Sequence, residues 1–231
     1  MKIKFITGDP HVEKHFPPTP MSKARPDWYN NLGGWQGVPH NSWPTIKKCM
    51  PVYDLITSGY MIYNPVEQEI IRVDKEDQPD VKRFMRRYPL AWGDRQDPQE
   101  GHDYSQCPVA HKGEKQDYVT FSVPWRIETP PGYSCLIMQP FYNMEDRFTV
   151  FPAIVDTDVI DVPWNNWPGQ VHKDRVLIEP GAPLVQVIPF KREDWDMQVE
   201  YDPSADNRDT GLKFWLANAY ARMFHQKKKF K

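Results

Sequence analysis

The sequence has no long apolar run, little net charge and few cysteines, and each absence excludes a class of protein. No run approaches the roughly 18 apolar residues of a transmembrane helix, and residues 1–14 have no apolar core of signal-peptide length. The formal net charge is −2, without the strongly basic domain typical of nucleic-acid binders. We therefore expect a protein that is not secreted, has no membrane partner and does not bind nucleic acid.

The cysteine content excludes a second class, the small secreted domain held together by disulfides. Cys49, Cys107 and Cys135 are odd in number and far apart, whereas such domains usually carry an even, closely spaced set. We therefore expect reduced thiols in a cytosolic setting. What the chain does contain is 24 prolines together with nine tryptophans, which indicates an ordered, loop-rich fold and not a disordered proline-rich tract.

Short apolar runs closed by Pro, Gly or Asn are densest in residues 129–192, and this pattern is typical of β-strands joined by tight connections. The segment VLIEPGAPLVQVIPF predicts strands at residues 176–178 and 184–190, with a turn at Pro180 and Gly181. Similar runs predict further strands at residues 2–7, 52–57, 60–63, 69–73, 118–123 and 125–128. The predicted fold class is therefore mainly β.

Helical patterns occur in three places. Residues 26–32 predict a turn of helix, and residues 80–88 predict a short surface helix with Asp at its start and Arg towards its end. Thr210 can cap a final amphipathic helix, whose apolar stripe consists of Leu212, Trp215, Leu216, Ala219, Tyr220 and Met223. Such a stripe is covered either by the β core or by another subunit, and both alternatives stay open.

The composition along the chain predicts three parts. Residues 1–44 form a strand and an irregular arm rich in proline and aromatic residues, residues 45–193 form the β core, and residues 194–231 form a linker and the final helix. The arm lies across its own domain or packs on a neighbouring subunit, because exposed aromatic extensions are typical of interfaces. The residues that would form this interface are Trp28, Tyr29, Trp35, Trp43 and, in the final helix, Trp215.

Two carboxylates, Asp156 and Asp158 in AIVDTDV, are the candidate catalytic residues. In a strand they would point to the same face about 7 Å apart. That arrangement suits a general base beside a metal-binding or positioning acid. The alternative is that both residues lie at a solvated strand end.

Other residue types with reactive side chains give weaker patterns. His102, Cys107 and His111 are spaced H-x4-C-x3-H, but zinc takes three or four such ligands, and a fourth is missing unless the fold brings Cys49, Cys135 or Asp103 close. Cys135 lies between apolar residues in an apparent strand, which indicates a small buried hydrophobe and not a nucleophile. We therefore predict no metal site.

Three segments of the core, PPGYSCLIMQP, AIVDTDV and IEPGAPLVQVIPF, resemble in order and approximate spacing three motifs of the trimeric deoxyuridine triphosphatases. The resemblance implies a β-clip (dUTPase-like) barrel or sandwich and a trimeric assembly. It also implies that Asp156 holds deoxyribose and activates water, and that Gln186 contacts the ligand. The chain departs from that family at residues 140–142 (PFY), where the phosphate-binding Ser-Gly pair is expected, and at residues 159–162 (VIDV), where Tyr-Arg-Gly-Glu is expected.

Longer motifs, PDWYNNL, TIKKCMPVYDLITSGY, TPPGYSCLIMQP and PGAPLVQVIPFKRE, resemble a family of uncharacterised proteins of tailed phages and some bacteria. They extend across most of residues 16–193. This resemblance implies a bacteriophage setting, with the virion or the host cytoplasm as the location and other phage structural proteins as partners. By analogy at the fold level, small trimeric β-clip proteins in phages serve as capsid decoration proteins.

Hypotheses of different classes follow from these observations. The leading one is a non-enzymatic structural or accessory phage protein, a homo-oligomeric β module without a cofactor. The alternative is a nucleotide-processing, dUTPase-like pyrophosphatase, with Asp156 as the base, Asp158 as the metal or positioning partner, Mg²⁺ as the cofactor and Gln186 as a ligand contact. The third hypothesis is a regulator that binds a nucleotide or small molecule at these same residues.

Overall fold

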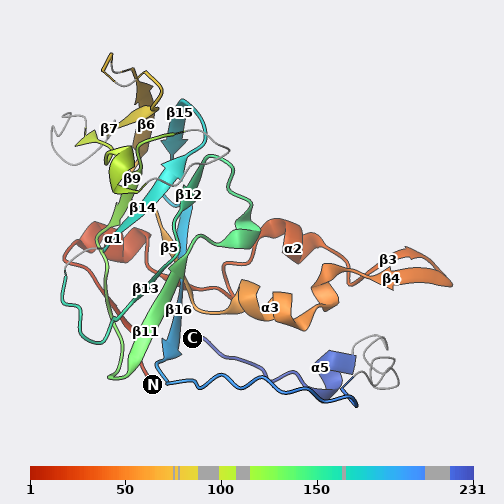
Figure 1. The fold of residues 1–231 in the computed structure, drawn as a ribbon. Helices are drawn as coiled ribbons and strands as arrows, with labels where there is room; N and C mark the ends of the chain where they lie inside the picture. The colour runs from red at the N-terminus through yellow and green to blue at the C-terminus, as the bar shows by residue number, and fades with distance from the viewer. Residues whose placement is uncertain (75, 78, 88–98, 108–114, 163–164, 206–218) are drawn as a thin grey trace. The chain divides into compact units, whose positions relative to one another are not determined.

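The computed structural model describes residues 1–74, 76–77, 79–87, 99–107, 115–162, 165–205 and 219–231. Internal contacts divide the chain into two compact units: unit 1 consists of Met1–Thr19 and Gly59–Lys191, and unit 2 of Pro20–Ser58 and Arg192–Lys231. Strands dominate the ribbon (Figure 1), so the predicted mainly β class is confirmed. No helix within the described ranges is long and apolar enough to cross a bilayer.

Unit 1 is built from antiparallel strands, with helix α1 (Pro10–His15) near its N-terminus. Two 3-10 turns, Tyr104–Gln106 and Phe141–Asn143, lie in its loops. Its strands are β1 (Lys4–Ile6), β5 (Tyr60–Tyr63), β6 (Gln68–Val73), β7 (Arg83–Arg87), β8 (Gln99–Glu100), β9 (Val119–Val123), β10 (Arg126–Glu128), β11 (Tyr133–Met138), β12 (Phe148–Val150), β13 (Ala153–Val155), β14 (Asn165–Val171), β15 (Arg175–Ile178) and β16 (Pro183–Lys191).

The sheet that organises unit 1 has the strand order β13-β11-β16-β5, and each neighbouring pair is antiparallel. β16 is an inner strand, paired with β11 on one side and with β5 on the other (Figure 1). Residues 184–187 of β16 are buried on both faces, which explains their continuous apolar pattern around a single Gln. The three segments that resemble deoxyuridine triphosphatase motifs thus supply neighbouring strands of one sheet.

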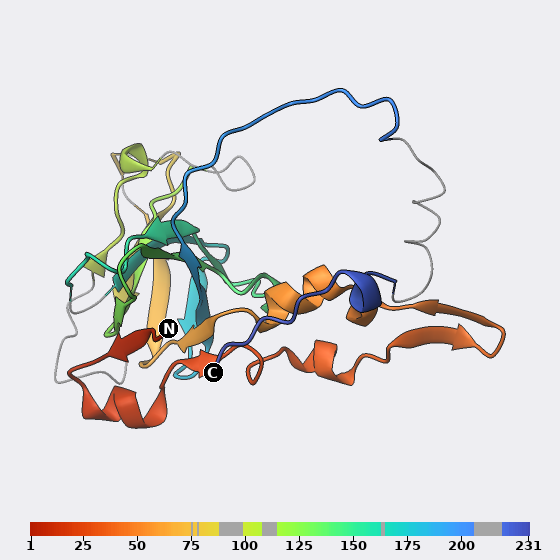
Figure 2. The ribbon, with the colours of Figure 1, turned by 90° about the horizontal axis from the view of Figure 1, so that it is seen from below.

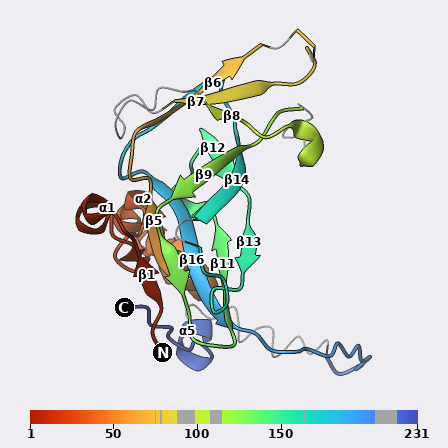
Figure 3. The ribbon, with the colours of Figure 1, turned by 90° about the vertical axis from the view of Figure 1, so that its left-hand side faces the viewer.

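Two further sheets, β12-β14-β9 and β15-β6-β7-β8, and the β1-β10 pair complete the described part of unit 1 (Figure 3). In β9 burial alternates, so that Val119, Phe121 and Val123 are buried, as the period of two in VTFSV predicts. One cluster of buried apolar side chains connects these sheets. Its members from different strands include Ile62, Ile70, Phe121, Ile127, Ile137, Val150 and Val187.

The helix predicted for residues 80–88 is wrong, because Arg83–Arg87 form β7 and pair with β6 over five residues. Arg83 is buried and donates from Nη1 to Oδ2 of the buried Asp117 at 2.9 Å. Arg86 is also buried and donates to the carbonyl of Thr120. Pairing with β6 and the hydrogen bonds of the two buried arginines outweigh a local helix preference, which is worth only tenths of a kcal/mol per residue.

A second correction concerns residues 52–57, which were predicted as a strand and instead belong to α3 (Met50–Thr57) in unit 2. Pro51 lies in the first turn, where its missing N–H removes no helical hydrogen bond. Val52, Leu55 and Ile56 are spaced i, i+3 and i+4 and share one helical face. The predicted strand that follows, β5, is confirmed.

The rest of unit 2 contains α2 (Asp27–Asn31), as predicted, and a hairpin of β3 (Trp35–Val38) and β4 (Asn41–Pro44). A 3-10 turn, Ile46–Lys48, leads into α3, and β2 (Thr19–Pro20) lies at the sequence boundary between the units. The arm predicted to be irregular is therefore partly regular. Gly37 permits the hairpin, because its φ is 116° and a Cβ would lie 2.2 Å from the Asn41 carbonyl oxygen.

The C-terminal helix is described only as the short α5 (Ala219–Met223). The predicted cap Thr210 and the stripe residues Leu212, Trp215 and Leu216 lie outside the described residues. Within α5, Tyr220 and Met223 are exposed. Figure 2 shows that the chain after β16 runs as a long extended segment.

Gly59 and Gly132 allow a test of how much a close backbone neighbour adds to the cost of replacing a glycine that has positive φ. Both have positive φ, 74° and 83°, but a Cβ on Gly59 would lie 2.0 Å from the Val187 carbonyl oxygen in β16, whereas one on Gly132 meets nothing within 4 Å. We expect Gly132→Ala to lower the free energy of unfolding by about 1–2 kcal/mol through backbone strain alone, and Gly59→Ala by more than about 3 kcal/mol. Urea unfolding followed by circular dichroism measures both, and equal losses would contradict the explanation.

Candidate functional site

The two candidate catalytic carboxylates do not lie together on one strand. β13 ends at Val155, Asp156 follows it, and Asp158 lies in the next turn. Asp156 accepts a hydrogen bond from Ser134 Oγ at 2.6 Å, and Asp158 accepts one from the backbone N–H of Gly132 at 2.7 Å. The expectation of two same-face strand carboxylates is therefore wrong: Asp156 binds the start of β11, and Asp158 binds the turn that precedes this strand.

Thr157, between the two aspartates, is buried. Its hydroxyl lies 2.7 Å from Thr129 Oγ1 and also donates to Cys135 Sγ at 3.3 Å, while its carbonyl accepts from the Thr129 N–H. Burial raises the pKa of the Cys135 thiol, which disfavours the thiolate that a nucleophile requires. Cys135 is thus a core residue, in agreement with the sequence interpretation.

An open hollow of about 320 Å³ lies beside this turn. Its lining residues are Arg126, Glu128, Thr129, Thr157, Asp158, Val159, Ile160 and Asp161. Arg126 forms ion pairs with Asp161 at 2.5 Å and with Glu128 at 2.7 Å. One guanidinium against three carboxylates gives the lining a formal charge of −2, and Lys4, which pairs with Glu128 at 3.0 Å, offsets one of these charges. The remaining negative charge disfavours phosphate groups unless a cation neutralises it.

Gln186, the predicted ligand contact, is buried inside the central sheet and is only 2% exposed. It pairs with Met138 of β11 and Met61 of β5. The position next to Asp156 along the sheet is that of Phe190, four residues further along β16, or about 13 Å away at roughly 3.3 Å per residue. Within one chain, the structure does not bring Gln186 and Asp156 together.

The histidine and cysteine pattern of the polar loop gives no centre in the described part of the chain. His102 stacks on the Tyr118 ring with centroids 4.6 Å apart, Cys107 is half-buried, and His111 lies outside the described residues. No group of three His, Cys, Asp or Glu side chains suitable for a metal ion occurs among the described positions.

The predicted interface aromatics divide into exposed and buried residues. Trp28, Trp35 and Trp43 are exposed, with Trp35 at 46% and Trp43 at 53%, whereas Tyr29 is buried. Trp215 lies outside the described residues. Trp28 and the more exposed pair of the β3-β4 hairpin are thus the described members of the predicted set that a partner can reach.

Sequence reasoning missed a second exposed apolar segment, within the predicted linker. Residues 194–202, DWDMQVEYD, alternate acidic or amide residues with Trp195, Met197, Val199 and Tyr201. All four of these side chains are at least 83% exposed. Strict alternation is the strand signal that could have identified the segment.

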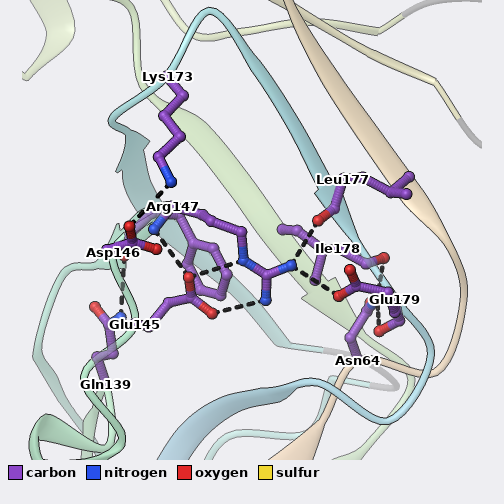
Figure 4. Close-up of polar contacts among 10 residues, drawn as sticks. Asn64, Gln139, Glu145, Asp146, Arg147, Lys173, Leu177, Ile178 and Glu179 are labelled. Atoms are coloured by element: carbon purple, nitrogen blue, oxygen red, sulfur yellow. Dashed lines mark hydrogen bonds and ion pairs between the residues drawn. The ribbon is translucent and has the colours of Figure 1, made fainter.

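Arg147 is the centre of a charged cluster near the loop where the phosphate motif was expected (Figure 4). Its Nε and Nη2 donate to the two carboxylate oxygens of Glu145 at 2.9 and 2.8 Å. Its Nη1 donates at 2.7 Å to both Glu179 and the Leu177 carbonyl at the end of β15. The guanidinium is therefore occupied in joining the loop before β12 to β15.

The ionisation of this cluster follows from its geometry. The hydrogen bond to Glu145 raises the pKa of Arg147. Burial alone would raise the pKa of Glu145, but the hydrogen bonds from Arg147 outweigh it and lower the pKa below its usual value. The same guanidinium lowers the pKa of Glu179. All three groups are thus charged at neutral pH.

Comparison with known proteins gives little to set beside this geometry. The sequence matches no protein-family profile and no curated protein. Among solved structures, the native EIAV dUTPase is similar with a TM-score of 0.35 and 11% sequence identity, over 63% of this chain and 84% of that chain. A likeness this weak assigns neither a fold family nor an activity.

We expect Arg147→Gln to lower the free energy of unfolding by about 1–3 kcal/mol at pH 7, because it removes charge-assisted hydrogen bonds from two carboxylates. The folded pKa values of Glu145 and Glu179 are depressed, so their stabilisation is present above the unfolded pKa of about 4.3 and is lost as the pH falls through the folded pKa values. The difference between wild type and variant should therefore shrink below about pH 4.3.

Urea unfolding between pH 7 and pH 3 measures this effect. Lys173→Gln is the matched control, since Lys173 forms an exposed ion pair with Asp146 at 2.9 Å in the same region and should cost at most about 1 kcal/mol. A difference between wild type and Arg147→Gln that stays constant with pH would contradict the coupling.

Proposed function

We propose that this chain is a non-enzymatic structural or accessory component of a phage particle and acts as a homo-oligomeric β module. The setting rests on the resemblance of its sequence motifs to tailed-phage proteins. That resemblance also makes the virion or the host cytoplasm its location and other phage structural proteins its partners.

The observation that carries the proposal is the β3-β4 hairpin. Every residue of both strands is exposed. Trp35 pairs with Pro44 and Trp43 pairs with Gln36, so the two indoles lie on opposite faces of the hairpin. A two-stranded hairpin is marginally stable in water by itself, and exposed aromatic side chains are typical of interfaces. Burial against a partner would stabilise both its strands and its turn.

The β-clip assignment is part of the proposal and draws its support from the central sheet. The three motif segments supply β11, β13 and β16, which are neighbours in unit 1. The three motifs lie apart in the sequence but meet in one sheet, which is what a β-clip core would require. A trimer is the assembly that this assignment implies.

The partners of the candidate catalytic residues support a role without catalysis. Asp156 binds Ser134 at the start of β11, Asp158 binds Gly132 in the turn before it, and both lie far from Gln186 along the sheet. A general base must reach the proton it abstracts, and a carboxylate that accepts from a neighbouring side chain is partly committed to that donor. These contacts suit a loop that is held in place.

We expect the purified chain to have a mass by light scattering that is a multiple of 27.2 kDa, and to co-purify with phage particles. The double variant Trp35→Ser, Trp43→Ser should weaken the association. Phe141→Ser is the matched control, because Phe141 is an exposed aromatic residue of unit 1 outside the hairpin. A chain that stays monomeric at every concentration and is absent from purified particles would contradict the proposal.

The alternative function, a Mg²⁺-dependent nucleotide pyrophosphatase, has one observation in its favour, the acidic hollow beside Asp158. Its carboxylates attract a divalent cation, and Asp156 is exposed nearby. We expect no pyrophosphate release from a set of deoxynucleotides with Mg²⁺ above that of Asp156→Asn. Release that Asp156→Asn abolishes would overturn the non-enzymatic proposal. A nucleotide that raises the melting temperature without turnover would instead support a binding regulator.

A further inference from the structure

Helix α1, which follows β1 in unit 1, carries two histidines on one face (Figure 1). The sequence HVEKH places His11 and His15 at positions i and i+4, which are neighbours on a helix surface. Their ring centroids are 4.6 Å apart and the ring planes meet at 40°. Both residues are exposed. Two imidazoles at this spacing are the arrangement with which a helix binds a zinc ion.

The ring nitrogens of this pair are available to a ligand. Within the described part of the chain, no side-chain hydrogen bond or ion pair engages His11 or His15. Other histidines of the chain are occupied: Nε2 of His172 lies 2.7 Å from Thr149 Oγ1, and Nε2 of His225 lies 2.9 Å from Asp54 Oδ1. A metal ion at α1 would therefore displace only water from the two rings.

Although α1 has only six residues, its backbone is fixed at both ends of the first turn. Oδ1 of Asp9 accepts from the backbone N–H of His11 at 2.8 Å and from that of Val12 at 3.2 Å, which caps the helix. Val12 is fully buried in the core cluster of unit 1. Because these contacts already hold the helix in place, chelation does not have to order its backbone, and this preorganisation favours binding.

An apolar ring lies beside the histidine pair. The centroid of Phe16 is 5.9 Å from that of His11 and 6.5 Å from that of His15. Phe16 in turn lies against the turn between β15 and β16, since a Cβ on Gly181 would be 3.9 Å from its Cε1. Apolar groups around metal ligands limit the access of solvent and strengthen the metal–ligand interaction. The pair is thus supported by a second element of unit 1.

The donor type selects the class of metal. Imidazole suits zinc, copper and nickel, whereas Mg²⁺ prefers oxygen ligands. Two protein ligands leave coordination positions for water, so such a site exchanges its metal readily and differs from a closed four-ligand structural site. In the zinc-protease pattern H-E-x-x-H the glutamate that acts as base directly follows the first histidine. Here the buried Val12 holds that position, so the pair suits metal binding without hydrolysis.

We propose that His11 and His15 chelate one divalent first-row transition-metal ion through one ring nitrogen each, with water at the remaining positions. The site depends neither on oligomer formation nor on the acidic hollow beside Asp158. It also gives α1 a metal-dependent stability, because the unfolded chain does not hold the two imidazoles at a fixed distance.

Isothermal titration calorimetry of the full-length chain, produced without a histidine tag, tests the proposal. One equivalent of metal should bind, with affinity rising from Co²⁺ to Ni²⁺ to Cu²⁺, and excess Mg²⁺ should not compete. His15→Gln should weaken Ni²⁺ binding at least about 10-fold, because the second ligand no longer acts at high effective concentration. His15 is exposed, and an unchanged circular dichroism spectrum checks that the variant is folded.

A matched control keeps the number of histidines in α1 and changes only their spacing. The double variant Glu13→His, His15→Gln places the two imidazoles at i and i+2, on opposite faces of the helix, and should bind Ni²⁺ no better than His15→Gln alone. His40→Asn is the second control. His40 is an exposed histidine of the β3-β4 turn with a φ of 72°, which Asn tolerates, and its replacement should leave binding unchanged.

Electron paramagnetic resonance of the Cu²⁺ complex gives an independent readout. The wild type should show couplings from two imidazole nitrogens, and His15→Gln from one. Equal Ni²⁺ affinity of the wild type and the spacing control would place the metal at other groups and overturn the proposal, as would the absence of Ni²⁺ binding up to millimolar concentration. Both results would leave the proposed role in a phage particle untouched, since that role is tested by mass and co-purification.

Discussion

The two antiparallel ladders on either side of β16 are the constraint on which the rest of unit 1 depends. β11 and β5 both pair with this strand, so a shift of register would break two sets of hydrogen bonds at once. Residues 184–187 are also buried on both faces. The close approach of Gly59 to the backbone of Val187 fixes where β5 begins. The turn that carries Asp156 and Asp158 is positioned in the same way, through β13 and its ladder with β11.

Local sequence patterns identified the strands whose formation can be predicted without knowing which strands pair with them. VLIEPGAPLVQVIPF combines dense apolar residues with a turn at Gly181, whose φ of 84° only glycine adopts readily, and the predicted strands are there. The sequence did not identify β7, because its stability comes from β6 and from Asp117, more than thirty residues away. In α3 the apolar run was too short to separate a period of 2 from one of 3.6.

The candidate site was predictable in its residue types but not in its contacts. The pair Asp156 and Asp158 was visible in the sequence, whereas their partners Ser134, at the start of β11, and Gly132, in the turn before it, come beside them only through the β11-β13 ladder. Residues 194–202 were missed for a different reason. Their acidic side chains give the segment the composition of a solvated linker, although its apolar residues alternate strictly with the polar ones. Periodicity and composition give opposite interpretations there, and the exposed side chains favour periodicity.

The direct passage from β16 into residues 192–202 has a mechanical consequence. A pull on that segment directed along the axis of β16 is perpendicular to the hydrogen bonds of its two ladders. The load is therefore shared by all of these bonds at once in shear, and they do not open one after another as in a strand peeled from its end. Tension along this axis is therefore opposed by both ladders of β16 together.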